Sequence, residues 1–174
     1  MIVIHALASL IALGLGALLL AASKRWKLHG SLGSLYHWTM LVVAISALAI
    51  SALRGRAVVF TYITPPSYAL ALLGYASGRV RWNGWLRWHI TGQSGSYIAL
   101  VTGLLFQTIP RLLPAAFFSA HRTAVLWTLF LLPALVAQPL IASTQIRWTA
   151  KKRAVLKRQQ NAAAGGSAEA FALQ

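Results

Sequence analysis

Acidic residues are almost absent from this chain, whose single carboxylate side chain is that of Glu169. Pumps, cation transporters and many hydrolases use carboxylates to bind protons or metal cations. Cysteine is missing altogether, which excludes disulfides, thiolate-ligated metal clusters and c-type haem attachment. The sequence therefore argues against most of these functions and leaves histidine to carry almost all of the possible chemistry.

Apolar residues, in contrast, make up 58% of the chain, and charged residues only 10%. Five apolar segments approach the roughly 20 residues that a helix needs to cross a bilayer core about 30 Å thick. They are Ile2 to Ala22, Leu35 to Leu53, Ala57 to Ala76, Ile90 to Ile109 and Ala124 to Ile146. The pattern predicts an all-α, polytopic transmembrane bundle of five helices. We expect one transmembrane domain over residues 1–150 and a basic juxtamembrane segment with a flexible tail over residues 151–174.

The distribution of positive charge predicts the orientation of these helices. The first apolar segment has no basic residues before it, so it is expected to remain as a helix with the N-terminus outside. With five spans, 12 of the 16 Lys and Arg residues, including Lys24 and Arg25, fall on the side of the C-terminus, and 4, including Arg56, fall on the other. Because positive residues favour the cytoplasm, we expect a multi-pass protein of the bacterial inner membrane with a cytoplasmic C-terminus.

The net charge of +15 also raises the question of nucleic-acid binding. The basic residues lie at the ends of the predicted helices and form no basic face interleaved with aromatic residues. Attraction to anionic lipid headgroups explains this placement better. We therefore expect membrane lipids, and no nucleic acid, among the partners.

Two connections and several prolines have distinct character. We expect an inner loop over Ser77 to Trp88 and an outer loop over Pro110 to Ser119. Proline removes a backbone donor and clashes with the preceding turn. The prolines within predicted helices are therefore expected to kink or break them; these are Pro65, Pro66, Pro133 and Pro139.

The five histidines fall into two tiers along the predicted helices. His5 and His121 lie near the outer ends, and His29, His37 and His89 near the inner ends. Histidine pairs on facing helices are the usual axial ligands of b-type haem in membrane bundles. The pattern favours a haem iron held by His89 and His37, or less readily by His89 and His29. A histidine at a helix end can instead extend to the interface and bind a carbonyl or lipid phosphate.

Two of these histidines begin stripes of small residues at helical spacing. The first stripe is His5, Ser9, Ala12 and Gly16, and the second is His89, Gly92, Ser96, Ala99 and Gly103. Such a groove leaves space for a flat macrocycle beside its ligand. The same pattern is the ordinary device for close helix packing in lipid, so both interpretations remain open.

Two stretches also carry a recognisable pattern, KLHGSLGSLYH from Lys27 to His37 and RWHITGQSGSYIALVTG from Arg87 to Gly103. The chain thereby resembles an uncharacterised family of bacterial multi-pass membrane proteins. The matching residues are His29, Gly33, Tyr36, His89, Ser96, Tyr97, Ile98 and Ala99. The family usually has Arg after the first loop histidine, where this chain has Gly30, which argues against an anionic ligand there.

The resemblance implies an inner site between the second and fourth helices, built around His29 and His89. Tyr36, Gln93 and Tyr97 would then be available to hydrogen-bond a haem propionate, a quinone carbonyl or an imidazole nitrogen. The likeness to two-haem cytochrome b bundles is an analogy of fold and ligand depth.

Three classes of function are consistent with the sequence. The first is a b-type haem or quinone-linked electron-transfer protein, favoured by the histidine tiers. The second is a non-catalytic accessory subunit that packs against a larger membrane complex, favoured by the small size and small-residue faces. The third is a small-molecule carrier, favoured only by the prolines.

Overall fold

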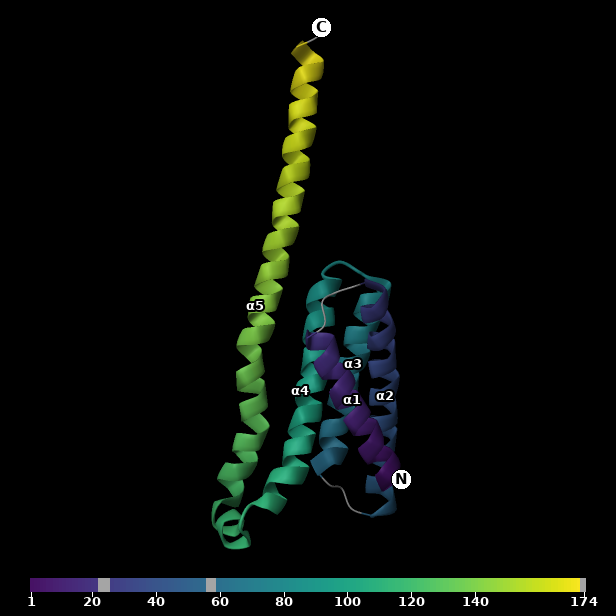
Figure 1. The fold of residues 1–174 in the computed structure, drawn as a ribbon, viewed down its shortest axis with the longest axis vertical. Helices are drawn as coiled ribbons and strands as arrows, with labels where there is room; N and C mark the ends of the chain where they lie inside the picture. Colours follow the sequence, from purple (N-terminus) through teal and green to yellow (C-terminus); the bar gives the residue numbers. More distant parts are fainter. Residues whose placement is uncertain (22–25, 56–58, 173–174) are drawn as a thin grey trace. The chain divides into compact units, whose positions relative to one another are not determined.

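The computed structural model describes residues 1–21, 26–55 and 59–172, and these form five α-helices and no strand. The helices are α1 (Ile2–Ala21), α2 (Trp26–Leu53), α3 (Val59–Val80), α4 (Trp85–Leu112) and α5 (Ala115–Ala172) (Figure 1). The prediction of an all-α chain with five helices is thus confirmed for the described residues. Lys24, Arg25 and Arg56, which contribute to the charge count, lie outside them.

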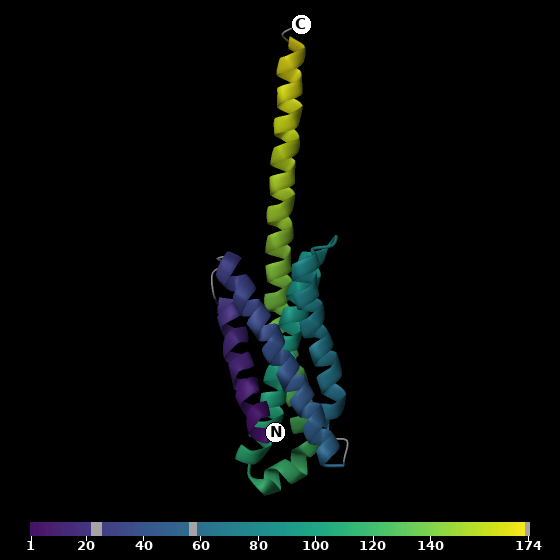
Figure 2. The ribbon, with the colours of Figure 1, turned by 90° about the vertical axis from the view of Figure 1, so that its right-hand side faces the viewer.

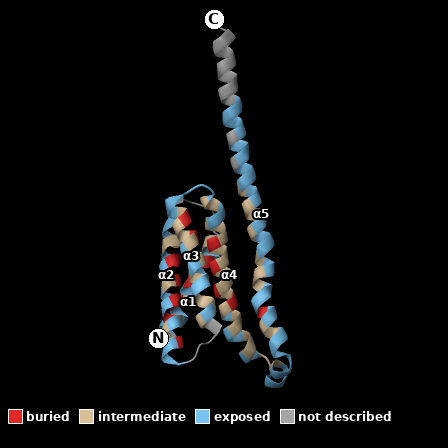
Figure 3. Cartoon of the chain, turned by 180° about the vertical axis from the view of Figure 1, so that it is seen from behind, coloured by how far each residue is buried: buried red, intermediate tan, exposed pale blue. Residues whose placement is uncertain are grey.

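Helices α1 to α4 form an antiparallel bundle in which each helix packs against the next and α1 also contacts α4 (Figures 1 and 2). The buried faces of these helices point toward one another (Figure 3). The residues at the centre of this core are Ala8, Ala12, Tyr36, Met40, Val43, Ala71 and Leu100. Up-and-down connectivity places the first turns of α2 and α4 at the same end of the bundle.

Helices α3 and α4 pack with their backbones in contact at the glycines of their shared seam. A Cβ atom added to Gly92 would lie 2.5 Å from the backbone nitrogen of Gly74 and 2.6 Å from the carbonyl oxygen of Leu70. Only hydrogen fits there, so the two backbones touch, as is common where small residues face each other in membrane bundles. The predicted small-residue stripe on α4 is therefore a packing surface in this structure.

The inner connection is shorter than the sequence predicted. Helix α3 continues to Val80 and α4 begins at Trp85, which leaves four residues, 81–84, instead of the expected loop from Ser77 to Trp88. Arg81 and Gly84 turn the chain with φ angles of 55° and 78°. The prediction failed because it ended each helix where apolar residues ended, whereas Trp, Arg and His can extend a helical backbone at only a small cost in helix propensity.

The outer loop was predicted from Pro110 to Ser119, and this prediction is also wrong. Pro110 lies inside α4, and the connection to α5 consists of Leu113 and Pro114. The backbone instead departs from helical geometry at His121, with φ −116° and ψ 19°, inside α5. The predicted breaks at Pro65, Pro66, Pro133 and Pro139 do not occur, since the backbone of α3 and α5 is helical at these residues. That they kink the helices stays a prediction.

The described residues divide into two compact units, 1–137 and 138–174. The second unit is a single stretch of α5, which is helical to Ala172. The division at residue 150 and the flexible tail stay predictions.

Three helical segments are long and apolar enough to cross a membrane: Ile2–Ala21, Leu28–Leu53 and Ala115–Asn161. Helices α3 and α4 contain more Ser, Thr, Gly, Gln and His, and do not reach the same mean hydropathy. Their polar residues are partly turned into the bundle: Ser77, Ser96 and Thr102 are buried.

Candidate functional site

The structure brings His29 and His89 together at the end of the bundle where α2 and α4 begin. Their ring centroids are 6.2 Å apart and their ring planes are inclined by 67°. Both side chains are half-buried. The pair joins residues that are far apart in the chain because α2 and α4 run parallel to each other within the antiparallel bundle.

His89 is held in place by the backbone of α3. Its Nδ1 atom lies 2.7 Å from the carbonyl oxygen of Gly74. A carbonyl can only accept a hydrogen bond, so Nδ1 carries the proton in this contact and the ring's lone pair lies on Nε2. A hydrogen bond of this kind is the usual way in which proteins orient a histidine that binds a metal through Nε2.

Glycines explain why the ring reaches this carbonyl. A Cβ atom added to Gly78, one turn after Gly74, would lie 2.9 Å from Nδ1 of His89. The imidazole therefore lies directly on the α3 backbone. Trp85 covers a further side of the ring, with centroids 6.1 Å apart.

Two glycines of α2 near His29 have no close neighbour. Gly33 follows His29 by one helical turn on the same face, is half-buried, and would have no atom within 4 Å of an added Cβ. Gly30 is equally open. The α4 groove beyond His89 is closed by α3, and the α1 groove is closed at Gly16 by the ring of Tyr97.

His37, the predicted partner of His89, lies in a different environment. It is only 4% exposed. Its ring stacks on that of Tyr75 at 4.1 Å and lies 5.7 Å from that of Tyr68. Its Nδ1 atom is buried without a hydrogen-bond partner. The described residues thus pair His89 with His29, and place His37 in an aromatic stack with α3.

The outer histidines are not brought together. Nδ1 of His5 lies 3.0 Å from Oγ of Ser46 on α2, so His5 has a structural contact that requires no cofactor. His121 is exposed at the non-helical point of α5, where its ring lies 4.7 Å from that of Phe117. Among the described residues, the two outer histidines share no ring contact.

The polar residues expected around the inner site have mixed placements. The hydroxyl of buried Tyr36 lies 3.0 Å from that of Ser96, so this pair satisfies itself inside the core. Gln93 packs on Gly74, and its Oε1 is buried without a hydrogen-bond partner. Tyr97 points to α1 and fills the space at Gly16.

Helix α3 contributes residues to this end of the bundle that no sequence motif indicated. Arg79 lies at the same end as the histidine pair, with Nη2 3.5 Å from Oγ of Ser34 and its guanidinium 5.3 Å from the centre of the Tyr75 ring. Tyr68 and Tyr75 are seven residues apart on one face of α3, a spacing that could have identified them as a pair.

The donor set suits a metal that needs few protein ligands. No group of three or more His, Cys, Asp or Glu side chains occurs among the described residues. Structural and catalytic zinc sites take at least three such ligands, whereas a haem would need only two histidines from the protein. Comparison of the chain with protein-family models, curated proteins and solved structures finds no match.

Proposed function

We propose that this protein is a multi-pass inner-membrane protein that carries a b-type haem for electron transfer at the His29 and His89 pair. The observation that carries the proposal is the 6.2 Å separation of the two rings. Two imidazole rings at this separation could both serve as ligands of one metal ion. Haem b, when bound, supplies an iron that accepts and releases one electron.

The surrounding residues have defined roles in this proposal. The Gly74 carbonyl holds the Nδ1 side of His89, so Nε2 is the ring nitrogen that would bind iron. Gly33 leaves room for a flat ring on the α2 side. Arg79 and Ser34 would hold the carboxylates of the cofactor, because the chain provides Arg79 with no acidic partner nearby; its only acidic residue is Glu169. A quinone carbonyl in place of haem would use the same end of the bundle.

The membrane arrangement supports an inner position for the site. Helix α3 packs against α2 and α4, and α4 also contacts α1, so we propose that all five helices cross the membrane despite the polar residues of the middle two. The N-terminus is outside and the C-terminus is cytoplasmic, following the charge bias. Arg79, Arg81 and Arg87 then mark the cytoplasmic end, where the histidine pair lies.

An absorption spectrum of the detergent-purified protein tests the proposal. After expression with a haem precursor, the dithionite-reduced protein should show the sharp α-band of a low-spin, bis-histidine b-type haem. Pyridine haemochrome analysis should give close to one haem per chain, because only the inner pair is assembled. A colourless protein under these conditions contradicts the haem proposal.

An accessory-subunit function is the second candidate, and one observation favours it. The first part of α5 has many exposed apolar side chains and makes no close backbone approach to α1 to α4 within unit 1. The exposed residues include Leu131, Leu132, Leu135 and Val136. A stable complex with one other membrane protein, at fixed stoichiometry in mild detergent, would support this function. The carrier hypothesis stays a prediction, although α3 and α5 continue as helix through their prolines.

A further inference from the structure

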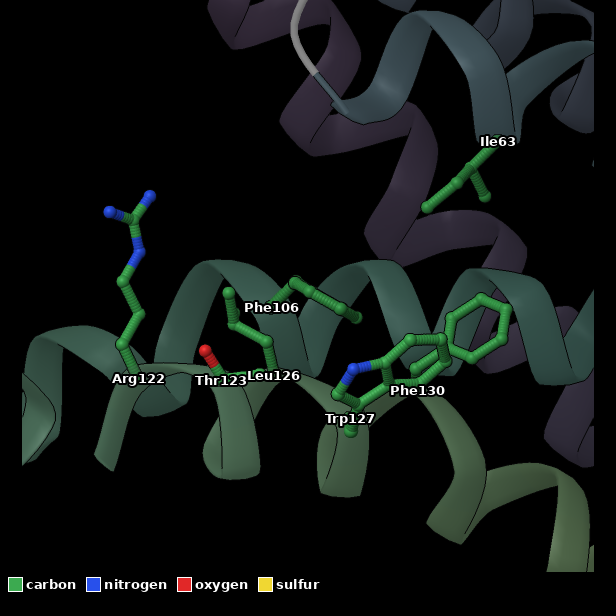
Figure 4. A pocket seen from close by; sticks show the side chains of 7 residues that line it. All are labelled: Ile63, Phe106, Arg122, Thr123, Leu126, Trp127 and Phe130. Atoms are coloured by element: carbon green, nitrogen blue, oxygen red, sulfur yellow. The ribbon is translucent and has the colours of Figure 1, made fainter.

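A second candidate site lies at the other end of unit 1 from the histidine pair, in a cleft between α3, α4 and the start of α5. The cleft has a volume of about 440 Å³, within the range of about 300 to 1,000 Å³ typical of ligand sites. Its lining residues are Ile63, Phe106, Arg122, Thr123, Leu126, Trp127 and Phe130, shown in Figure 4. All of them belong to unit 1, and none is a histidine.

The cleft changes from polar to apolar along α5. Arg122 and Thr123 lie at one end, and Leu126, Trp127 and Phe130 follow within two turns (Figure 4). Phe130 lies eight positions after Arg122, which corresponds to about 12 Å along a helix. An aliphatic chain lying along this length would contact aromatic and branched side chains while its polar end remained beside the arginine.

Arg122 has no acidic side chain within unit 1 to pair with. It is exposed, and the chain's only carboxylate side chain is that of Glu169 in the other unit. Arg111, at the same end of unit 1, differs because its guanidinium donates to the carbonyl oxygen of Gln107 on its own helix. Arginine binds phosphate groups through paired hydrogen bonds, so a lipid phosphate is the natural partner for Arg122.

The separation of α5 from its neighbours leaves the cleft accessible. Residues 115–137 make no close backbone approach to α1 to α4, and the cleft is lined by side chains from α3, α4 and α5. Of the described apolar side chains on this part of α5, only Leu129 is buried. A helix that stands off in this way, with an arginine at one end of the gap, suits a lipid molecule that fills the gap.

We propose that this cleft binds one anionic phospholipid, with its phosphate on Arg122 and an acyl chain along Leu126, Trp127 and Phe130. Charge selects the lipid class, because a zwitterionic lipid brings its own cation to compete with Arg122. The inference needs only that the protein lies in a membrane. It is independent of the proposed haem site, which lies on other residues.

Fluorescence quenching by brominated lipids tests the proposal on the full chain. Bromine on an acyl chain quenches a tryptophan that it touches, and the signal of Trp127 is obtained as the difference between the parent and Trp127→Phe. Brominated phosphatidylglycerol should quench this difference signal at a mole fraction at least threefold lower than brominated phosphatidylcholine. Arg122→Gln should abolish the preference, and the matched control Arg111→Gln should keep it.

Three outcomes would overturn the proposal. Equal quenching of Trp127 by both lipids would show that the cleft is filled by bulk lipid with no preference for an anionic headgroup. A preference that survives Arg122→Gln would place the headgroup elsewhere. The third outcome is that inorganic phosphate removes the preference whereas chloride at the same ionic strength does not. That result would indicate a site for phosphate alone. Haem content is unaffected in every arm, so failure here is separable from failure of the electron-transfer proposal.

Discussion

The imidazole of His37 stacks on the phenol ring of Tyr75 with 4.1 Å between centroids and 6° between ring planes. This contact joins α2 to α3 in the bundle core. The ring of Tyr68 lies 5.7 Å from the same imidazole. His37 therefore contributes to the core as a flat ring between α2 and α3, which differs from the ligand function that its depth suggested.

Replacing His37 separates its structural function from a ligand function. His37→Ala should lower the free energy of unfolding by about 2 to 4 kcal/mol, as other large-to-small core substitutions do. His37→Phe retains a flat ring and removes the buried, unpartnered nitrogen, so its cost should be below about 1.5 kcal/mol. Unfolding in detergent measures both. A His37→Phe protein that is as unstable as His37→Ala would show that the nitrogen itself is needed.

The α3 to α4 seam gives a second stability prediction. Gly92→Ala should cost about 1 to 3 kcal/mol, because its new Cβ would overlap the Gly74 backbone. Gly14→Ala on α1 is the matched control, since nothing lies within 4 Å of its added Cβ. That variant should be neutral or more stable by up to about 1 kcal/mol, from the higher helix propensity of alanine. Equal melting of Gly92→Ala and the parent would mean that the seam is not closed.

The inner connection allows a sharp test of topology. Reporter proteins fused after Asn83 and after Gln174 should both be active only as cytoplasmic reporters, and one fused after Leu112 only as a periplasmic reporter. The Asn83 fusion decides whether α3 and α4 both cross, since their polar residues lower their hydropathy. A periplasmic signal at Asn83 would overturn the proposed orientation and the inner placement of the histidine pair.

The helices could be predicted from the sequence because a long apolar segment in lipid must satisfy its backbone hydrogen bonds internally. The ends of the helices could not be predicted in this way, because the need to satisfy backbone hydrogen bonds in lipid does not stop a helix from continuing beyond the membrane core. Helix α2 begins at Trp26, nine residues before the predicted start at Leu35. Likewise Pro110 and Pro133 lie within helices, since one lost hydrogen bond does not outweigh the surrounding ones.

The candidate site was partly predictable. Depth along the chain placed His29, His37 and His89 in one tier, and the motif resemblance selected His29 and His89. Depth alone does not specify which helix faces meet. His29 and His37 are about 12 Å apart along α2, so only one of them can be level with His89. The contribution of α3, through the Gly74 carbonyl and Arg79, depends on packing that no sequence motif records.

Substitution of single histidines tests the ligand assignment. His29→Ala and His89→Ala should each remove the low-spin α-band, because each leaves the iron with one imidazole. His5→Ala and His37→Phe should retain the band, as His5 is bound to Ser46 and His37 stacks on Tyr75. Reduced absorption spectra normalised to protein concentration provide the measurement.

A further variant probes the orientation of His89 without removing it. Gly78→Ala places a methyl group 2.9 Å from Nδ1, so the imidazole must move away from the Gly74 carbonyl and lose the hydrogen bond that fixes its tautomer. We expect the Gly78→Ala protein to retain haem, with a shifted reduction potential or a partly high-spin spectrum. Gly33→Ala adds a methyl group on the open α2 side and should instead reduce the haem content. Both variants leave the two ligands in the chain. A Gly78→Ala spectrum and potential identical to those of the parent would show that His89 does not bind iron through the ring held by Gly74.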